Sequence, residues 1–111
     1  MIKLKKLLLT TILIVPKLAF GTEASPVAQI KTMNTYSESG TVFIRLETNG
    51  SICSNGYFLD PNPTPGYDLN VSTLLAAYFN AESIRIFADD TVLWSGSSLP
   101  TCKIDSVSVT N

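Results

Sequence analysis

Few residues of this 111-residue chain have the types and spacing needed for chemistry. The chain contains no histidine, which removes the commonest general base and a frequent metal ligand. A serine or cysteine nucleophile would therefore lack its usual partner. No spacing singles out a carboxylate pair of the glycosidase type. The sequence predicts a protein that is not an enzyme and that needs no cofactor.

A calcium site could in principle be built from Asp89-Asp90 together with either Asp60 or Asp68. Their spacing does not match an EF-hand loop, in which the ligands fall at alternate positions of a twelve-residue segment. Paired aspartates in a tight turn are also usually solvated. The sequence therefore favours the absence of a bound metal.

Cys53 and Cys102 are the only cysteines. Two free thiols, or half of a metal site, are the alternatives to a disulfide. Two cysteines without histidine do not complete a structural zinc site. In an oxidising compartment we expect one disulfide. Closing a loop of about 50 residues would stabilise the fold by roughly 4 kcal/mol in the chain-entropy model.

The N-terminus indicates export. Three lysines in the first six residues precede an apolar run over residues 7–15, and small residues follow at Ala19 and Gly21. The run rises only about 14 Å as a helix, too short for a bilayer core of roughly 30 Å. We expect a signal peptide cleaved after Gly21, with cleavage after Ala24 as the alternative. An amphipathic helix packed on the domain is the other interpretation.

The expected mature chain, residues 22–111, is one small domain that is secreted or periplasmic and is not inserted in a membrane after cleavage. It keeps four basic residues against nine acidic ones, a net charge of −5. An acidic surface with isolated basic residues does not attract nucleic acid or anionic lipid. We therefore expect neither as a partner.

The first half of the mature chain favours strands. After a polar leader over residues 22–26, we expect strands over residues 27–33, 41–48 and 52–59, because apolar and β-branched residues alternate with polar ones there. Asn49-Gly50 between the last two is typical of a tight hairpin turn.

The second half favours a helix and then strands. A proline-rich loop over residues 60–66 is followed by a helix with Asp68 or Asn70 as N-cap. Its apolar residues recur at helical spacing, namely Val71, Leu74, Leu75, Tyr78 and Phe79. Strands are expected over residues 83–88 and 102–110, the latter with a bulge at 105–106. Asp89-Asp90 is expected to turn the chain into a short apolar piece over residues 91–94.

This order predicts a mainly β fold with one helix, an OB-like five-stranded Greek-key barrel (β-β-β-α-β-β). A third strand after the helix would be added if residues 91–94 pair. The disulfide would then tie the third strand to the start of the last one. A helix packed on one open antiparallel sheet is the alternative architecture.

Aromatic residues near turns are the best candidates for binding. Tyr36, Tyr57 and Tyr67 lie in or beside turns, and Trp94 lies near a polar, glycine-containing loop. Rings with an apolar face and a polar tip suit stacking on a sugar or docking on a protein. The alternative is that Trp94 and Tyr57 cover a small core.

Residues 36–109 resemble the binding (B) subunits of subtilase-type and typhoid-type bacterial toxins. The resemblance lies in Tyr36-Ser37-Glu38 before a β-hairpin, in Ser-Asn-Gly-Tyr-Phe at 54–58, in the helix segment 72–79, and in Glu-Ser-Ile-Arg-Ile-Phe at 82–87. It implies an OB fold, ring-shaped homopentamers and recognition of cell-surface glycans, often sialylated. It also implies that Ser37, at the position of a glycan-contacting serine, binds the ligand.

We therefore expect a secreted binding module whose ligand is a cell-surface glycan or protein, with Tyr36, Ser37 and Trp94 as its binding residues. A small envelope protein with a structural or protein-interaction role, and no small ligand, is the second hypothesis.

Overall fold

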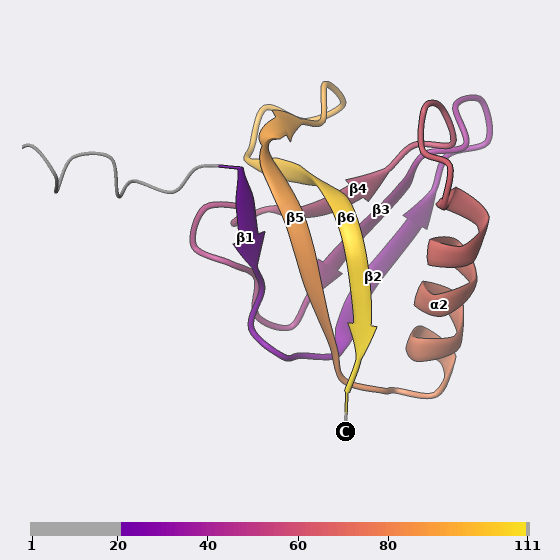
Figure 1. Cartoon of the computed structure of the whole chain (residues 1–111), viewed down its shortest axis with the longest axis vertical. Helices are drawn as coiled ribbons and strands as arrows, with labels where there is room; N and C mark the ends of the chain where they lie inside the picture. The colour runs from indigo at the N-terminus through magenta and orange to yellow at the C-terminus, as the bar shows by residue number, and fades with distance from the viewer. Residues whose placement is uncertain (1–20, 111) are drawn as a thin grey trace, which may run out of the picture.

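The computed structural model describes residues 21–110, and the expected signal peptide lies outside this range apart from Gly21. The elements follow the order seen in Figure 1: β1 (Thr22–Ala24), β2 (Ile30–Thr35), β3 (Val42–Leu46), β4 (Gly56–Leu59), α2 (Tyr67–Phe79), β5 (Ile84–Leu93) and β6 (Thr101–Val109). Across residues 21–110, no helix has the length and apolar character needed to cross a membrane.

The strands form one sheet in the order β1-β5-β6-β4-β3-β2. Neighbours are antiparallel except β4 and β6, which are parallel. Just before β2, Ala28 bridges Ile84 of β5 through two backbone hydrogen bonds of 2.9 Å. This bridge joins the two ends of the sheet, so the predicted OB-like barrel is confirmed.

The barrel has six strands in the described residues, and the predicted number of five is wrong. The additional strand is β1, which lies in the segment expected to be a polar leader. It pairs with β5, with Glu23 opposite Ala88. A three-residue strand has no detectable periodicity, and its position depends on contacts that Glu23 makes far along the chain.

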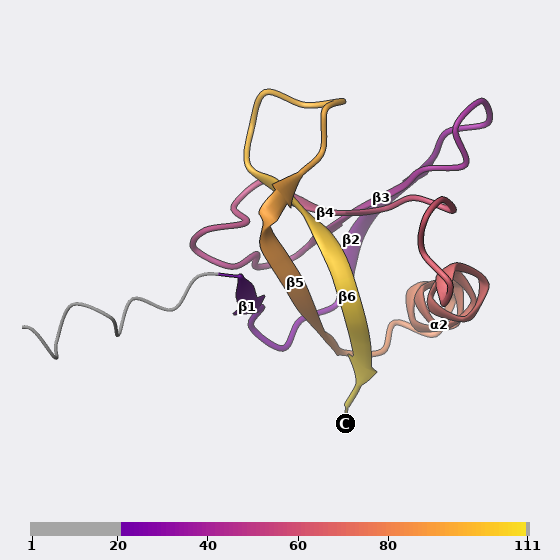
Figure 2. The same cartoon turned by 45° about the horizontal axis from the view of Figure 1, so that its top comes forward.

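The core lies inside the barrel and beneath α2. Alternate residues of β3 and β5 point inward and are buried, as the alternation predicts. Leu74 and Ala77 of α2 join them, so the helix closes one side of the barrel, as Figure 2 shows. The buried apolar side chains at the centre include Val42, Ile44, Leu46, Leu59, Leu74, Ile84, Ile86 and Ile104.

The tight turn predicted at Asn49-Gly50 is wrong, because β3 ends at Leu46 and β4 begins only at Gly56. The Asn49 side chain instead accepts a hydrogen bond from Leu46 N at 2.9 Å. Gly50 N donates to the hydroxyl of buried Tyr57 at 3.0 Å. The segment is thus a long loop held by tertiary contacts, which outweigh the local preference for a two-residue turn.

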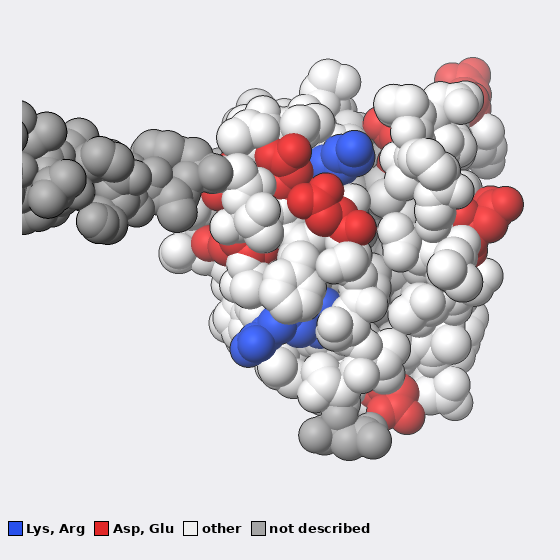
Figure 3. Space-filling view, in the orientation of Figure 1, with Lys and Arg blue, Asp and Glu red and all other residues white. Residues whose placement is uncertain are grey.

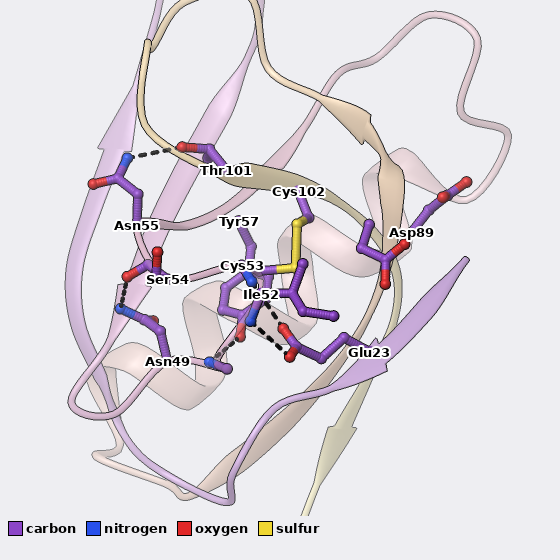
Figure 4. Close-up of a disulfide and its surroundings, with 12 residues drawn as sticks. Glu23, Asn49, Ile52, Cys53, Ser54, Asn55, Tyr57, Asp89, Thr101 and Cys102 are labelled. Carbon is purple, nitrogen blue, oxygen red and sulfur yellow. Dashed lines mark hydrogen bonds between the residues drawn. A yellow bond between two sulfur atoms is a disulfide. The ribbon is translucent and has the colours of Figure 1, made fainter. Parts of the chain in front are cut away.

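The predicted disulfide between Cys53 and Cys102 is confirmed, with Cα atoms 5.5 Å apart. Figure 4 shows it joining the loop before β4 to the start of β6. The sequence predicts Cys53 within the third strand of the barrel. In the structure it lies instead in the loop that precedes β4. Tyr57 and Cys102 are register partners on β4 and β6, so the disulfide reinforces the parallel pair.

Two further boundaries differ from expectation. The helix begins at Tyr67, with Gly66 as an N-cap that has no side-chain cap bond, so neither Asp68 nor Asn70 caps it. Asp89-Asp90 is not a turn, because β5 continues through it to Leu93 with irregular pairing. The bulge expected at residues 105–106 is confirmed by the register shift opposite Phe87 and Ala88.

Candidate ligand-binding site around Trp94

Trp94 directly follows β5 and is fixed by its backbone, whose N–H donates to Thr101 O at 2.9 Å. Its half-buried indole stacks over two buried phenylalanines that are partners on neighbouring strands, Phe43 and Phe58. The ring centroids lie 5.6 Å and 6.2 Å from that of Trp94, with interplanar angles of 21°. The interpretation of Trp94 as a cover for apolar side chains is therefore correct in part.

Tyr36 lies against the same indole, with ring centroids 5.5 Å apart and a tilt of 55°. The tyrosine is 41% exposed. Two of the three residues predicted to bind a ligand are therefore neighbours in space. Tyr57, by contrast, is fully buried, and burial raises its pKa above the usual value near 10.

Two clefts border Trp94. The first, about 460 Å³, is lined largely by polar residues, namely Ser39, Thr41, Asp60, Pro61, Asn62, Trp94, Ser95 and Gly96. The second, about 310 Å³, is more apolar and adds Phe58, Val92, Leu93 and Lys103. Both clefts share Asp60, Asn62, Trp94 and Ser95, so they adjoin at these four residues.

A hydrogen-bonded chain of side chains forms the polar wall of the first cleft. Thr41 Oγ1 donates to Asp60 Oδ1, so its only proton is used. Ser39 Oγ must therefore be the donor in its 2.7 Å bond to Thr41 Oγ1. Within the described residues, the hydrogen bond to Asp60 is made to Oδ1 and not to Oδ2. The wall thus presents one oriented carboxylate with an unused acceptor.

Three connections supply these residues, and they lie at the same end of the barrel in Figure 1: the turn between β2 and β3, the segment between β4 and α2, and the loop between β5 and β6. The turn is fastened to its neighbours. Gly40 has a φ of +73°, its carbonyl accepts a hydrogen bond from Tyr67, and a Cβ at this position would lie 3.0 Å from Pro61.

The loop after β5 is equally constrained at Gly96. A Cβ at this position would lie 2.4 Å from Cε2 and Cζ2 of the Trp94 indole. Glycine is therefore required for the loop backbone to lie against the ring. The position of Trp94 is thus set by Phe43 and Phe58 together with Gly96.

Ser37, the third predicted binding residue, is exposed in the turn beside Tyr36 and lines neither cleft. Ser39, Thr41 and Asn62 were not predicted from the sequence as binding residues, and Asp60 was considered there only as a calcium ligand. The proline-rich loop and the polar turn were visible in the sequence, but no local pattern indicates that they meet.

The acidic residues considered for calcium are engaged separately. Asp89 Oδ1 accepts hydrogen bonds from the Thr91 hydroxyl and backbone N–H, and these bonds lower the pKa of Asp89, with a smaller contribution from Lys103. Asp90 Oδ1 accepts one from Gly21 N at 2.9 Å. Within residues 21–110, no three metal-binding side chains gather at one place.

Charged side chains are scattered over the surface. On the face shown in Figure 3, acidic groups stand beside isolated basic ones. Near the candidate site, Lys103 lines the second cleft, and the Arg45 guanidinium lies 5.1 Å from the Phe43 ring centroid. Arg45 is held by Asn55, to which it donates from Nε and Nη2. The site is therefore of mixed charge.

A larger cleft of about 590 Å³ lies between α2 and the end of β6. Its lining contains no aromatic side chain, and Glu82 is its one charged residue. The other lining residues are Ser72, Thr73, Ala76, Ala77, Asn80 and Val109. The chemistry of this groove is less specific than that of the Trp94 clefts, despite its size.

No family model matches the chain. No characterised protein matches it in sequence. Among solved structures, it is similar to the cholera toxin-like B-subunit from Citrobacter freundii, with a TM-score of 0.54 and 18% identity over 83% of this chain and 88% of that chain. The resemblance to toxin B subunits predicted from the sequence is confirmed at the level of the fold: this chain has the OB-like fold of a bacterial toxin B-subunit.

Proposed function

We propose that this chain is a secreted or periplasmic binding module that holds a cell-surface glycan in the Trp94 clefts. The observation that carries the proposal is the meeting of an aromatic pair, Tyr36 and Trp94, with the oriented carboxylate of Asp60. Sugars offer both apolar C–H faces and hydroxyl donors, and this combination of groups can bind both.

The polar wall supports recognition of hydroxyl groups. The Asp60 carboxylate accepts hydrogen bonds and donates none, so its unused oxygen favours a ligand O–H. Thr41 and Ser39 hold the carboxylate in place before a ligand arrives, which lowers the entropy lost on binding. Asn62 supplies an amide with both donors and acceptors at the junction of the clefts.

Tyr36 and Ser37 lie on the exposed turn at the rim of the site. In the proposed complex they contact a second sugar unit beyond the clefts. The toxin B-subunit resemblance supports this role for Ser37.

The residues that line the clefts favour binding of a glycan without its hydrolysis. A glycoside hydrolase of the common type needs two carboxyl groups flanking the scissile bond. Asp60 is the only carboxylate that lines either cleft beside Trp94. We therefore assign no catalytic step to this site.

Assembly into a homopentamer is the second part of the proposal. Helix α2 exposes large apolar side chains, with Leu69 73% and Phe79 78% exposed. Surface of this kind often marks an interface. The same observation favours the alternative function, a protein-interaction domain of the envelope that binds no small ligand.

A glycan array tests the proposal with the chain of residues 22–111. Trp94→Ala and Asp60→Asn are the informative variants, and Glu38→Gln is the control because Glu38 is exposed in the turn between β2 and β3 and lines neither cleft. We expect glycan signals that both informative variants lose and the control keeps. A folded protein with no glycan signal, or with signals that survive in both variants, would contradict glycan binding.

Solution mass distinguishes the two functional candidates further. We expect a pentamer for the glycan-binding module, measured by light scattering at micromolar concentration. A monomer that also fails the array would favour the envelope interaction domain.

A further inference from the structure

β1 is built into the barrel through the side chain of Glu23. Its Oε1 accepts a hydrogen bond from Cys53 N at 2.9 Å, and its Oε2 accepts bonds from Ile52 N at 2.9 Å and from the Ser51 hydroxyl at 3.2 Å. Figure 4 shows this carboxylate lying beneath the loop that carries the disulfide. The N-terminal strand therefore holds the loop whose Cys53 is bonded to β6.

Gly50 provides the space for this contact. A Cβ at position 50 would lie 2.2 Å from Oε1 of Glu23. The loop backbone thus closes tightly around the carboxylate, which satisfies donors of Ser51, Ile52 and Cys53 together. Removing Glu23 would leave those donors without their partner.

Just before β1, Asp90 forms hydrogen bonds with both the N–H and the carbonyl of Gly21. Asp90 Oδ1 accepts from Gly21 N at 2.9 Å, and Asp90 N donates to Gly21 O at 3.0 Å. The other carboxylate oxygen, Oδ2, is buried and has no hydrogen-bond partner among the described residues. A buried acceptor without a donor is unfavourable, so a donor placed beside Asp90 Oδ2 would stabilise this part of the described fold.

We propose that export cuts the chain between Gly21 and Thr22, and that the new α-ammonium group of Thr22 pairs with the Asp90 carboxylate. A signal peptidase hydrolyses the peptide bond with one water, leaving a carboxylate on Gly21 and an amine on Thr22 that takes up a proton. Ala19 and Gly21 are the small residues that such cleavage requires at the third and first positions before the cut.

The ammonium group replaces one amide N–H with three donors and a positive charge beside Asp90. The Thr22 nitrogen is one peptide unit from the Gly21 nitrogen that Asp90 already binds. The cut removes the Gly21 N–H and also the Gly21 carbonyl, which accepts from Asp90 N. In the proposed pairing the ammonium group replaces the lost donor and adds one for the second carboxylate oxygen, while water accepts from Asp90 N. Bonds between two charged groups are stronger than those to a neutral amide.

The alternative cut, after Ala24, conflicts with the fold. It removes β1 and with it the Glu23 carboxylate from the disulfide loop. It also exposes the edge of β5 from Phe87 to Asp89, which β1 covers. The cut after Gly21 and the pairing of Thr22 with Asp90 do not involve the ligand, so their tests are independent of the tests for glycan binding.

The first test is the intact mass of the full chain, residues 1–111, exported with its own leader from a bacterial host. We expect a mature protein that begins at Thr22. A protein that begins at Ser25, or that keeps its leader, would overturn the position of the cut.

The second test measures the pairing in the chain that begins at Thr22, with its amine free or acetylated. We expect acetylation to lower the melting temperature by roughly 4 °C in the natural sequence, and by much less in Asp90→Asn. Glu38→Gln, an exposed control of equal charge change that lies outside β1 and β5, should keep the full difference. Equal melting of the two natural forms, or an undiminished difference in Asp90→Asn, would overturn the pairing.

Discussion

Tyr36 and Trp94 lie with ring centroids 5.5 Å apart, although one follows β2 and the other follows β5. This contact joins two loops at one end of the barrel. Beneath it the indole rests on Phe43 and Phe58, and beside it Asp60 is held by Thr41. An aromatic surface and an oriented carboxylate thus border the same cleft, and this arrangement motivates the proposed glycan site.

Asp60→Asn should weaken glycan binding about tenfold, because the amide that replaces the carboxylate loses a charge-assisted acceptor worth roughly 1.5 kcal/mol. The asparagine Oδ1 can still accept from Thr41, so the melting temperature should change little. Binding would be measured by titration with the strongest glycan from the array. Unchanged affinity would remove Asp60 from the site.

Gly96→Ala should displace the indole, because the new Cβ would lie 2.4 Å from its ring atoms. Trp94 is the only tryptophan, so its fluorescence emission reports the change directly. We expect emission at longer wavelength and weaker glycan binding. Ser98→Ala, in the same loop, is the control and should leave both unchanged. An unaltered spectrum in Gly96→Ala would show that the loop can move away without disturbing the ring.

Replacing both cysteines, Cys53→Ala with Cys102→Ala, should lower the free energy of unfolding by about 2–5 kcal/mol, since the unfolded chain is no longer constrained. Urea unfolding measures this quantity. The reduced natural protein should show a similar loss. If the loss were below about 0.5 kcal/mol, the disulfide would not be a major source of stability.

Glu23→Gln should lower the free energy of unfolding by about 1–2 kcal/mol, because the bonds to Ile52 and Cys53 lose their charged acceptor. Glu47→Gln is the control, since Glu47 is exposed just after β3. Urea unfolding of both variants gives the comparison. Equal effects in the two would mean that the β1 contact is not specific.

Alkaline pH should destabilise the fold through Tyr57, whose pKa burial raises above its ordinary value near 10. The folded state holds this proton more tightly than the unfolded state. Stability is therefore full below pH 10 and falls as the pH rises toward the pKa of the folded state. Unfolding by urea across pH 9–12 should show this slope, with a smaller slope in Tyr57→Phe. The exposed Tyr78→Phe control should keep the natural slope.

The elements that follow from local patterns could be predicted from the sequence. The alternation in β3, the apolar spacing in α2 and the bulge in β6 each leave a signal in neighbouring residues. The disulfide followed from the number of cysteines and the expected compartment. Together these were sufficient for the order of a closed OB-like barrel.

The features that depend on distant contacts could not be predicted. The Asn49-Gly50 segment favours a tight turn locally, yet Glu23 and Tyr57 hold it in a long loop. β1 itself is too short for a periodic pattern. In the site, Tyr36 and Trp94 could be predicted as binding residues because they are aromatic and lie near turns. The chain from Ser39 through Thr41 to Asp60 spans two loops, so only the fold brings it together.

The proposed site is tested most directly by NMR of the ¹⁵N-labelled chain, residues 22–111, titrated with neutral and sialylated cell-surface oligosaccharides. We predict that the indole N–H of Trp94 and the backbone amides of Asn62 and Ser95 shift, and that Asp60→Asn reduces these shifts at equal glycan concentration. Shifts confined to α2, or no shift with any oligosaccharide of either class, would contradict a glycan site at Trp94.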